Sequence, residues 1–169
     1  MRRFAAVLAM LLLAACGRGT LQVDTALPRA DYSPSEKVRV MLPPPGKQSE
    51  EGGRSVSGRI VQVLQQTHAD VQLLPTTDAG SALADARSAQ AAYLIEPAIT
   101  AWSQGQAPPF TADHLTVRME LVNVTSGAVV SAVTFDNTSS LFSVSDAPPQ
   151  NLLDARFDEA VRTLMGIPH

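Results

Sequence analysis

The side chains that could carry out chemistry in this chain are few and lie far apart. The only cysteine is Cys16, and the three histidines are His68, His114 and His169. A metal site needs several ligands that converge, and these histidines share no spacing with acidic partners that would bring this about. No serine lies in a Gly-x-Ser-x-Gly motif, which marks the nucleophile of one large class of hydrolases. The sequence therefore predicts no catalytic residue, no metal site and no cofactor.

Cys16 closes a segment that is organised like a secretory signal. Arg2 and Arg3 give it a positive start, residues 4–13 are almost wholly apolar, and Ala15 precedes the cysteine. A basic start, an apolar core and small residues before a cleavage site are typical of signal peptides. The apolar core is shorter than the roughly 20 residues that a membrane-spanning helix needs. We expect residues 1–15 to be a signal peptide that is cleaved between Ala15 and Cys16.

The sequence Leu13-Ala14-Ala15-Cys16 resembles the lipobox of bacterial lipoproteins, in which the cysteine becomes the acylated first residue of the mature chain. The resemblance implies that Cys16 carries acyl chains such as palmitate. Gly17 follows the cysteine, and the enterobacterial sorting rule implies that a lipoprotein with glycine here leaves for the outer membrane. We therefore expect a lipid anchor in the outer membrane and a domain that faces the periplasm. The alternative is an ordinary secretory signal that happens to be followed by a cysteine.

The composition of the mature chain excludes several classes of protein. Cleavage would leave 154 of the 169 residues, which is a single-domain length. The loss of Arg2 and Arg3 reduces the basic residues from 13 to 11 against 16 acidic ones, so the net charge becomes −5. A negative chain without a basic block is not expected to bind nucleic acid. Since Cys16 is the only cysteine, the domain contains no disulfide.

The hydrophobic pattern divides the mature chain into two parts. Residues 16–36 contain two prolines, lack steady periodicity and are predicted to be the lipidated cysteine followed by a flexible tether. About 20 flexible residues would span roughly 25 Å. Residues 37–166 are predicted to be one globular domain. Its expected strands cover residues 38–42, 71–74, 93–102, 115–124 and 129–135, and its expected helices cover residues 55–67, 76–90 and 150–165.

The order of these elements is β-α-β-α-β-β-β-α, which predicts a two-layer α/β (α+β) domain. We expect one mixed sheet of about five strands with the helices mainly on one face. The first three strands should be parallel, because a helix connects each to the next, and the last two should form a hairpin. Pro97 indicates an edge or a bulge, Glu96 is expected to face outward, and Gly58 is expected to allow close helix packing.

From Tyr93 onward the chain resembles a family of uncharacterised bacterial lipoproteins built around one domain of unknown function. The resemblance rests on Tyr93-Leu94-Ile95, Pro97, Ile99, Trp102, Thr125-Ser126-Gly127 and Pro149-Gln150-Asn151-Leu152-Leu153. Members usually carry charged residues just after the tryptophan, whereas this chain has Ser103-Gln104-Gly105-Gln106. The resemblance implies a lipoprotein with a compact α/β domain and brings no activity.

The expected strand directions place the three longest connections at one edge of the sheet. These are residues 43–53, 103–113 and 138–149. The edge would bring together Trp102, which directly precedes the second connection, with Phe110, Leu141 and Phe142. Because the carboxyl ends of strands are the usual binding edge of an open α/β sheet, we expect a contact surface here for another envelope protein or a lipid-like ligand. The alternative is that these side chains fold back and close the end of the core.

Taken as a sequence, the chain predicts an outer-membrane lipoprotein that acts by binding, as an accessory protein of the envelope, and not as an enzyme. A small periplasm-facing hydrolase and a purely structural envelope protein are the alternatives. A deep pocket with converging polar groups would favour the hydrolase, whereas an exposed apolar patch would favour the binding protein.

Overall fold

The computed structural model describes residues 19–27, 33–103, 112–139 and 149–168. These residues form a mixed sheet of six strands in the order β1-β6-β5-β4-β2-β3. The elements along the chain are β1 (Thr20–Val23), β2 (Lys37–Met41), α2 (Glu50–Leu64), β3 (Asp70–Leu74), α3 (Ala79–Ser88), β4 (Tyr93–Ser103), β5 (His114–Asn123), β6 (Ala128–Thr138), a 3-10 turn η1 (Pro149–Leu152) and α4 (Ala155–Leu164). The predicted α+β class and mixed sheet are confirmed.

The strand directions agree with the expected connections. β2 pairs in parallel with both β3 and β4, whereas β5 is antiparallel to β4 and to β6. The hairpin of β5 and β6 forms because apolar residues alternate along both strands, and its turn ends at Gly127, which has a φ of 69°.

The sheet contains one strand more than the sequence predicts. Residues 20–23 form β1, which pairs antiparallel with β6. The expectation of a flexible tether over residues 16–36 is therefore wrong for this stretch. Leu21 packs against the main core. Such a short strand can form at the edge of the sheet because β6 offers it a pairing partner and the core offers Leu21 an apolar contact.

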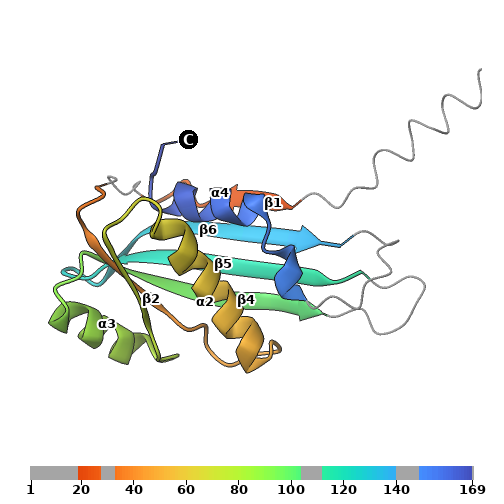
Figure 1. Cartoon of the computed structure of the whole chain (residues 1–169), viewed down its shortest axis with the longest axis horizontal. Helices are drawn as coiled ribbons and strands as arrows, with labels where there is room; N and C mark the ends of the chain where they lie inside the picture. The colour runs from red at the N-terminus through yellow and green to blue at the C-terminus, as the bar shows by residue number, and fades with distance from the viewer. Residues whose placement is uncertain (1–18, 28–32, 104–111, 140–148, 169) are drawn as a thin grey trace, which may run out of the picture.

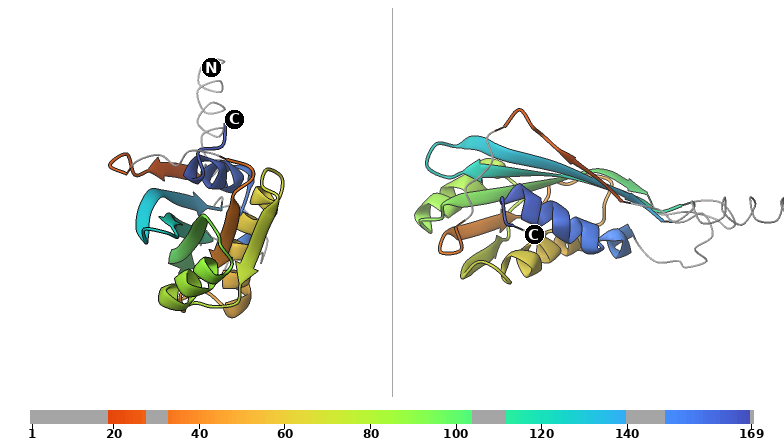
Figure 2. Two further views of the ribbon diagram at one scale, coloured as in Figure 1. Left: turned by 90° about the vertical axis from the view of Figure 1, so that its left-hand side faces the viewer. Right: turned by 90° about the horizontal axis from the view of Figure 1, so that it is seen from above.

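Two helices cover one face of the sheet (Figure 1). α2 and α4 pack together there, and the main core lies between them and the inward side chains of β2, β4, β5 and β6. Phe135 of β6 and Phe157 of α4 meet edge to face with ring centroids 5.2 Å apart. α3 packs against side chains that point away from the main core, among them Met41 and Leu94, and forms a second, smaller core with them on the other face of the sheet. Figure 2 shows the same arrangement from two further sides.

The helix boundaries differ from the predicted ones at their N-termini. α2 begins at Glu50 and not at residue 55, because Ser49 caps it by accepting a hydrogen bond from the Gly52 backbone N–H. The expected last helix divides into η1 and α4, since Asp154 accepts hydrogen bonds from the backbone N–H groups of Arg156 and Phe157 and caps a new helix.

Pro97 lies within β4 at a position that has a neighbouring strand on one side only. β2 pairs with β4 only as far as Ile95, so Pro97 has β5 alone as a neighbouring strand. A register shift follows between Ile99 and Ala101. The local edge and the bulge that Pro97 indicated are both present.

Candidate functional site

The ends of two long strands lie level with each other at one edge of the sheet, which we call the carboxyl edge. It is formed by the last residues of β4 and β6, Ser103 and Thr138, which both pair with His114. β2 ends at Met41 and pairs with β4 only as far as Ile95, eight residues before β4 ends. β2 and β4 are parallel, and β6 runs in the same direction as β4 because β5 is antiparallel to both. The connections after all three strands therefore leave in the same direction, but only those after β4 and β6 start at the carboxyl edge, and the one after β2 starts farther back along the sheet. In Figure 1 the arrowheads of β4 and β6 point to it.

Trp102 is placed at this edge with its ring turned toward the helix layer. The indole is half-buried and packs against the main core. It lies so close to α2 that a Cβ added to Gly52 would be 2.5 Å from its Cη2 atom. Trp102 thus closes the end of the core, which corresponds to the alternative stated for it above. Phe110, Leu141 and Phe142 lie outside the described residues, so the contact surface expected there stays a prediction.

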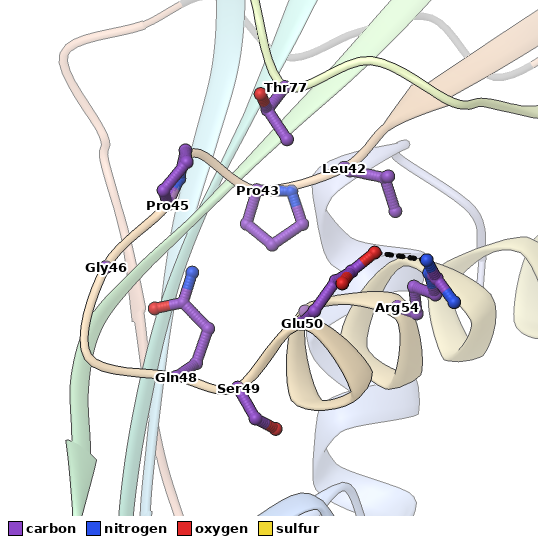
Figure 3. Close-up of a pocket in the computed structure, with 10 residues that line it drawn as sticks. Leu42, Pro43, Pro45, Gly46, Gln48, Ser49, Glu50, Arg54 and Thr77 are labelled. Carbon is purple, nitrogen blue, oxygen red and sulfur yellow. Dashed lines mark hydrogen bonds and ion pairs between the residues drawn. The ribbon is translucent and has the colours of Figure 1, made fainter.

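A pocket lies beside the first turn of α2, at the end of β2 (Figure 3). Its walls are mostly carbon, from Leu42, Pro43 and Pro45. Among its polar groups, the Gln48 Nε2 donates to the Pro44 carbonyl over 2.7 Å and the Glu50 carboxylate pairs with Arg54, whereas the buried Gln48 Oε1 has no hydrogen-bond partner in the described part of the chain. Glu50 and Arg54 are both largely exposed. The pocket offers a shape for a small apolar group and no acid–base pair aimed into it.

The sheet face opposite α2 and α4 carries polar side chains along β5 and β6. Asp136 accepts a hydrogen bond from the Thr116 hydroxyl over 2.6 Å, and its Oδ2 lies 2.8 Å from the His114 Nε2. Partial burial acts to raise the pKa of Asp136, but the hydrogen bonds from Thr116 and His114 outweigh it and the pKa is lowered. These three residues form a small network without a nucleophile that is poised for attack.

Two carboxylates face each other on the same surface. Glu96 of β4 lies directly across from Glu120 of β5, and Glu120 pairs with Arg118 over 2.9 Å. Burial raises the pKa of Glu96, and the neighbouring charge of Glu120 adds to the effect. Sequence reasoning placed Glu96 on the outward face but missed this pair, because the cross-strand partner depends on the register of β4 against β5.

Metal-ligating side chains do not gather within the described ranges, where no three His, Cys, Asp or Glu residues form a possible metal site. His68 is buried, and burial lowers its pKa, which favours the neutral imidazole. No helix in the described part of the chain is both long enough and apolar enough to cross a bilayer. Cys16 and Ala15 lie outside the described residues, so acylation and cleavage there stay predictions.

Comparison with known proteins relates the fold to solved structures. No protein-family model and no curated protein matches the chain. PelC from Paraburkholderia phytofirmans, solved as a dodecamer, has a TM-score of 0.69 and 22% identity over 90% of this chain and 100% of its own. XCC0632 from Xanthomonas campestris, of the family DUF330, has a TM-score of 0.53 and 15% identity over 90% of this chain and 95% of its own. Lipoprotein GNA1162 from Neisseria meningitidis has a TM-score of 0.50 and 9% identity over 77% of this chain and 99% of its own.

Proposed function

The chain shares its fold with a lipoprotein and with a protein of unknown function, and we propose that it is itself a lipoprotein of the bacterial outer membrane. Its domain faces the periplasm and acts by binding, as an accessory subunit of the envelope. The observation that carries the proposal is the signal-like segment that ends in Leu13-Ala14-Ala15-Cys16, the only cysteine in the chain. Several acyl chains on one cysteine would provide a durable anchor, since each buried CH₂ contributes about 0.8 kcal/mol.

The anchor can be tested on the protein extracted from membranes. Intact mass spectrometry should give a chain that begins at Cys16 and is heavier than the unmodified residues 16–169 by the mass of its lipid. Cys16→Ala should remain an unprocessed precursor that still contains residues 1–15. A mature chain that begins elsewhere, or an unmodified Cys16, would refute the lipoprotein assignment.

The binding role includes contacts between copies of this chain. Both outer strands of the sheet, β1 and β3, have one side without a strand partner among the described residues. They lie at opposite ends of the sheet, so contacts between unlike edges would join copies in one direction and could close into a ring. PelC of Paraburkholderia phytofirmans, which has a similar fold, is a dodecamer.

Self-association can be measured by native mass spectrometry of the lipidated protein in a mild detergent. We expect a defined multiple of the chain mass. Val23 of β1 and Leu73 of β3 are the large apolar side chains that are more than one third exposed in the described residues, at 38% and 41%. Their replacement by lysine should shift the protein to monomers and leave its circular dichroism unchanged. A wild-type protein that is monomeric at all concentrations would contradict this role.

A further inference from the structure

The folded domain begins very close to the proposed lipid anchor. Gly19 is buried, and its carbonyl oxygen accepts a hydrogen bond from the Arg156 Nη1 over 2.9 Å. A Cβ added to Gly19 would lie 3.3 Å from the Phe135 ring, so the backbone is packed tightly against β6. Thr20 then pairs with Asp136 as the first residue of β1. The chain is therefore fixed to the domain from Gly19 onward.

Only Gly17 and Arg18 separate Gly19 from Cys16. Three Cα–Cα steps of a fully extended chain reach about 11 Å. β4, by contrast, has 11 residues, and a strand of that length extends over about 35 Å. A lipid held in the bilayer through Cys16 can thus touch one end of the sheet and not the other.

The register of the strands identifies which end this is. β1 begins opposite Asp136, two residues before β6 ends at Thr138. Thr138 pairs with His114 at the start of β5, and His114 pairs with Ser103 at the end of β4. Gly19 therefore lies at the carboxyl edge, and Figure 1 shows β1 starting beside the arrowhead of β6, at the end of the sheet to which the arrowhead of β4 also points.

The side chains at these strand ends are hydroxyl groups and one pair, His114 with Asp136, whose side chains are 38% and 40% exposed. Thr20, Ser103 and Thr138 are exposed and carry uncharged hydroxyl groups. The mature chain has an excess of acidic residues, yet the side chain that ties Gly19 to α4 is the basic Arg156. Hydroxyl groups can hydrogen-bond to headgroup phosphates, and a guanidinium adds attraction to them.

We infer that the carboxyl edge is a membrane-contact surface, which lies on the bilayer while the strands run away from it. The hairpin turn at Thr125-Ser126-Gly127, at the far end of β5, then projects into the periplasm. This inference rests on the proposed acylation of Cys16 and adds to it an orientation that acylation alone does not give. Any protein partner approaching from the periplasm would meet the hairpin end first.

Single cysteines can report this orientation without background. An acylated Cys16 has no free thiol, and the chain contains no other cysteine. Ser103→Cys places a thiol at the end of β4, and the matched control Ser126→Cys places one in the exposed hairpin turn. Each purified lipidated variant is labelled with a nitrobenzoxadiazole dye and reconstituted into phosphatidylethanolamine–phosphatidylglycerol vesicles. The vesicles also contain lipid with a nitroxide on its headgroup, and the quenching of the dye by this nitroxide is measured for each variant.

We expect strong quenching of the dye at position 103 and little at position 126, because the hairpin lies about one strand length, roughly 30 Å, farther from the lipid. A second variant inserts between Arg18 and Gly19 twelve Gly and Ser residues, a flexible segment with an r.m.s. span of about 19 Å. This insertion should reduce the quenching at position 103 while the lipid on Cys16 and the circular dichroism stay unchanged.

The outcomes separate this inference from the proposed function. A lipidated protein whose two dyes are quenched equally, or whose dye at position 126 is quenched more, would overturn the inference and leave the lipoprotein assignment intact. Unchanged quenching after the insertion would overturn the argument from linker length. A mature chain without lipid on Cys16 would instead refute the proposed function.

Discussion

The contact between Gly52 and Trp102 provides the sharpest test of how the carboxyl edge is built. Gly52 lies in the first turn of α2, and a Cβ placed there would be 2.5 Å from Cη2 and 2.7 Å from Cζ2 of the indole. Gly58 lies in the same helix, is exposed, and would have nothing within 4 Å of its added Cβ. Two Gly→Ala substitutions in one helix thus differ strongly in what surrounds the new methyl group.

The expected effects have opposite signs. Alanine is favoured over glycine inside a helix by about 0.8–1 kcal/mol, so Gly58→Ala should stabilise the protein by an amount of that order. At Gly52 the same gain is opposed by the displacement of a packed ring, and overpacking typically costs about 1–3 kcal/mol. Gly52→Ala should therefore lower the free energy of unfolding relative to Gly58→Ala by about 1–3 kcal/mol.

Urea unfolding of the mature domain, with Cys16 replaced by serine, measures both effects. Trp102 is the only tryptophan, so its fluorescence should also change in folded Gly52→Ala and stay unchanged in folded Gly58→Ala. Circular dichroism provides the matching record of secondary structure. Equal stabilisation by the two substitutions, with no change in the emission of Trp102, would show that the indole does not pack on α2.

The remaining predictions concern charged groups. Arg59 makes two hydrogen bonds of 2.8 and 2.7 Å to Asp158 and so links α2 to α4. Because the pair is part-exposed, a double-mutant cycle with alanine at both positions should give a coupling energy of about 0.5–1 kcal/mol in urea unfolding. A coupling energy of zero would contradict the link. Asp136 has a lowered pKa in the folded protein, so its contribution to stability should be present above the unfolded pKa and be lost as the pH falls through the folded pKa. The melting temperature of Asp136→Asn should therefore lie below that of the wild type at pH 7 and approach it in acid. Glu96 has a raised pKa, so its ionisation should destabilise the fold as the pH rises from the unfolded to the folded pKa; Glu96→Gln should raise the melting temperature at pH 7 and have no such effect well below the ordinary pKa of a glutamate. Identical pH dependence in the wild type and either variant would refute the corresponding pKa shift.

The sequence alone was sufficient for the features that depend on short-range pattern. Alternation along residues 115–124 and 129–135 predicted the hairpin of β5 and β6. Helical spacing of apolar residues predicted α2 and the last helix, and an alanine-rich composition predicted α3. The connections between elements then determined the strand directions, because a helix between two neighbouring strands makes them parallel. These directions identified the carboxyl edge before the structure located any side chain at it.

Sequence reasoning failed where a neighbour from far along the chain decides the outcome. Thr20–Val23 is too short and too weakly patterned to be recognised as a strand, and it becomes one only through its pairing with β6, more than a hundred residues later. Gly58 was expected to provide close packing, but it faces open space, and Gly52 is the glycine that the indole requires. Neither the pairing of residues 20–23 nor the difference between Gly52 and Gly58 can be predicted from the neighbouring residues in the sequence.

The sequence by itself determined the signal-like segment with its single cysteine, the class of the domain and the direction of its strands, because these follow from local composition, periodicity and connection type. Only the tertiary structure decided that Glu96 faces Glu120, that Trp102 rests on Gly52, and that the chain is held from Gly19 onward. Each of these depends on strand register or on packing between distant segments. Register and packing are set by the burial of the whole core, to which many residues contribute and which no short stretch of sequence specifies.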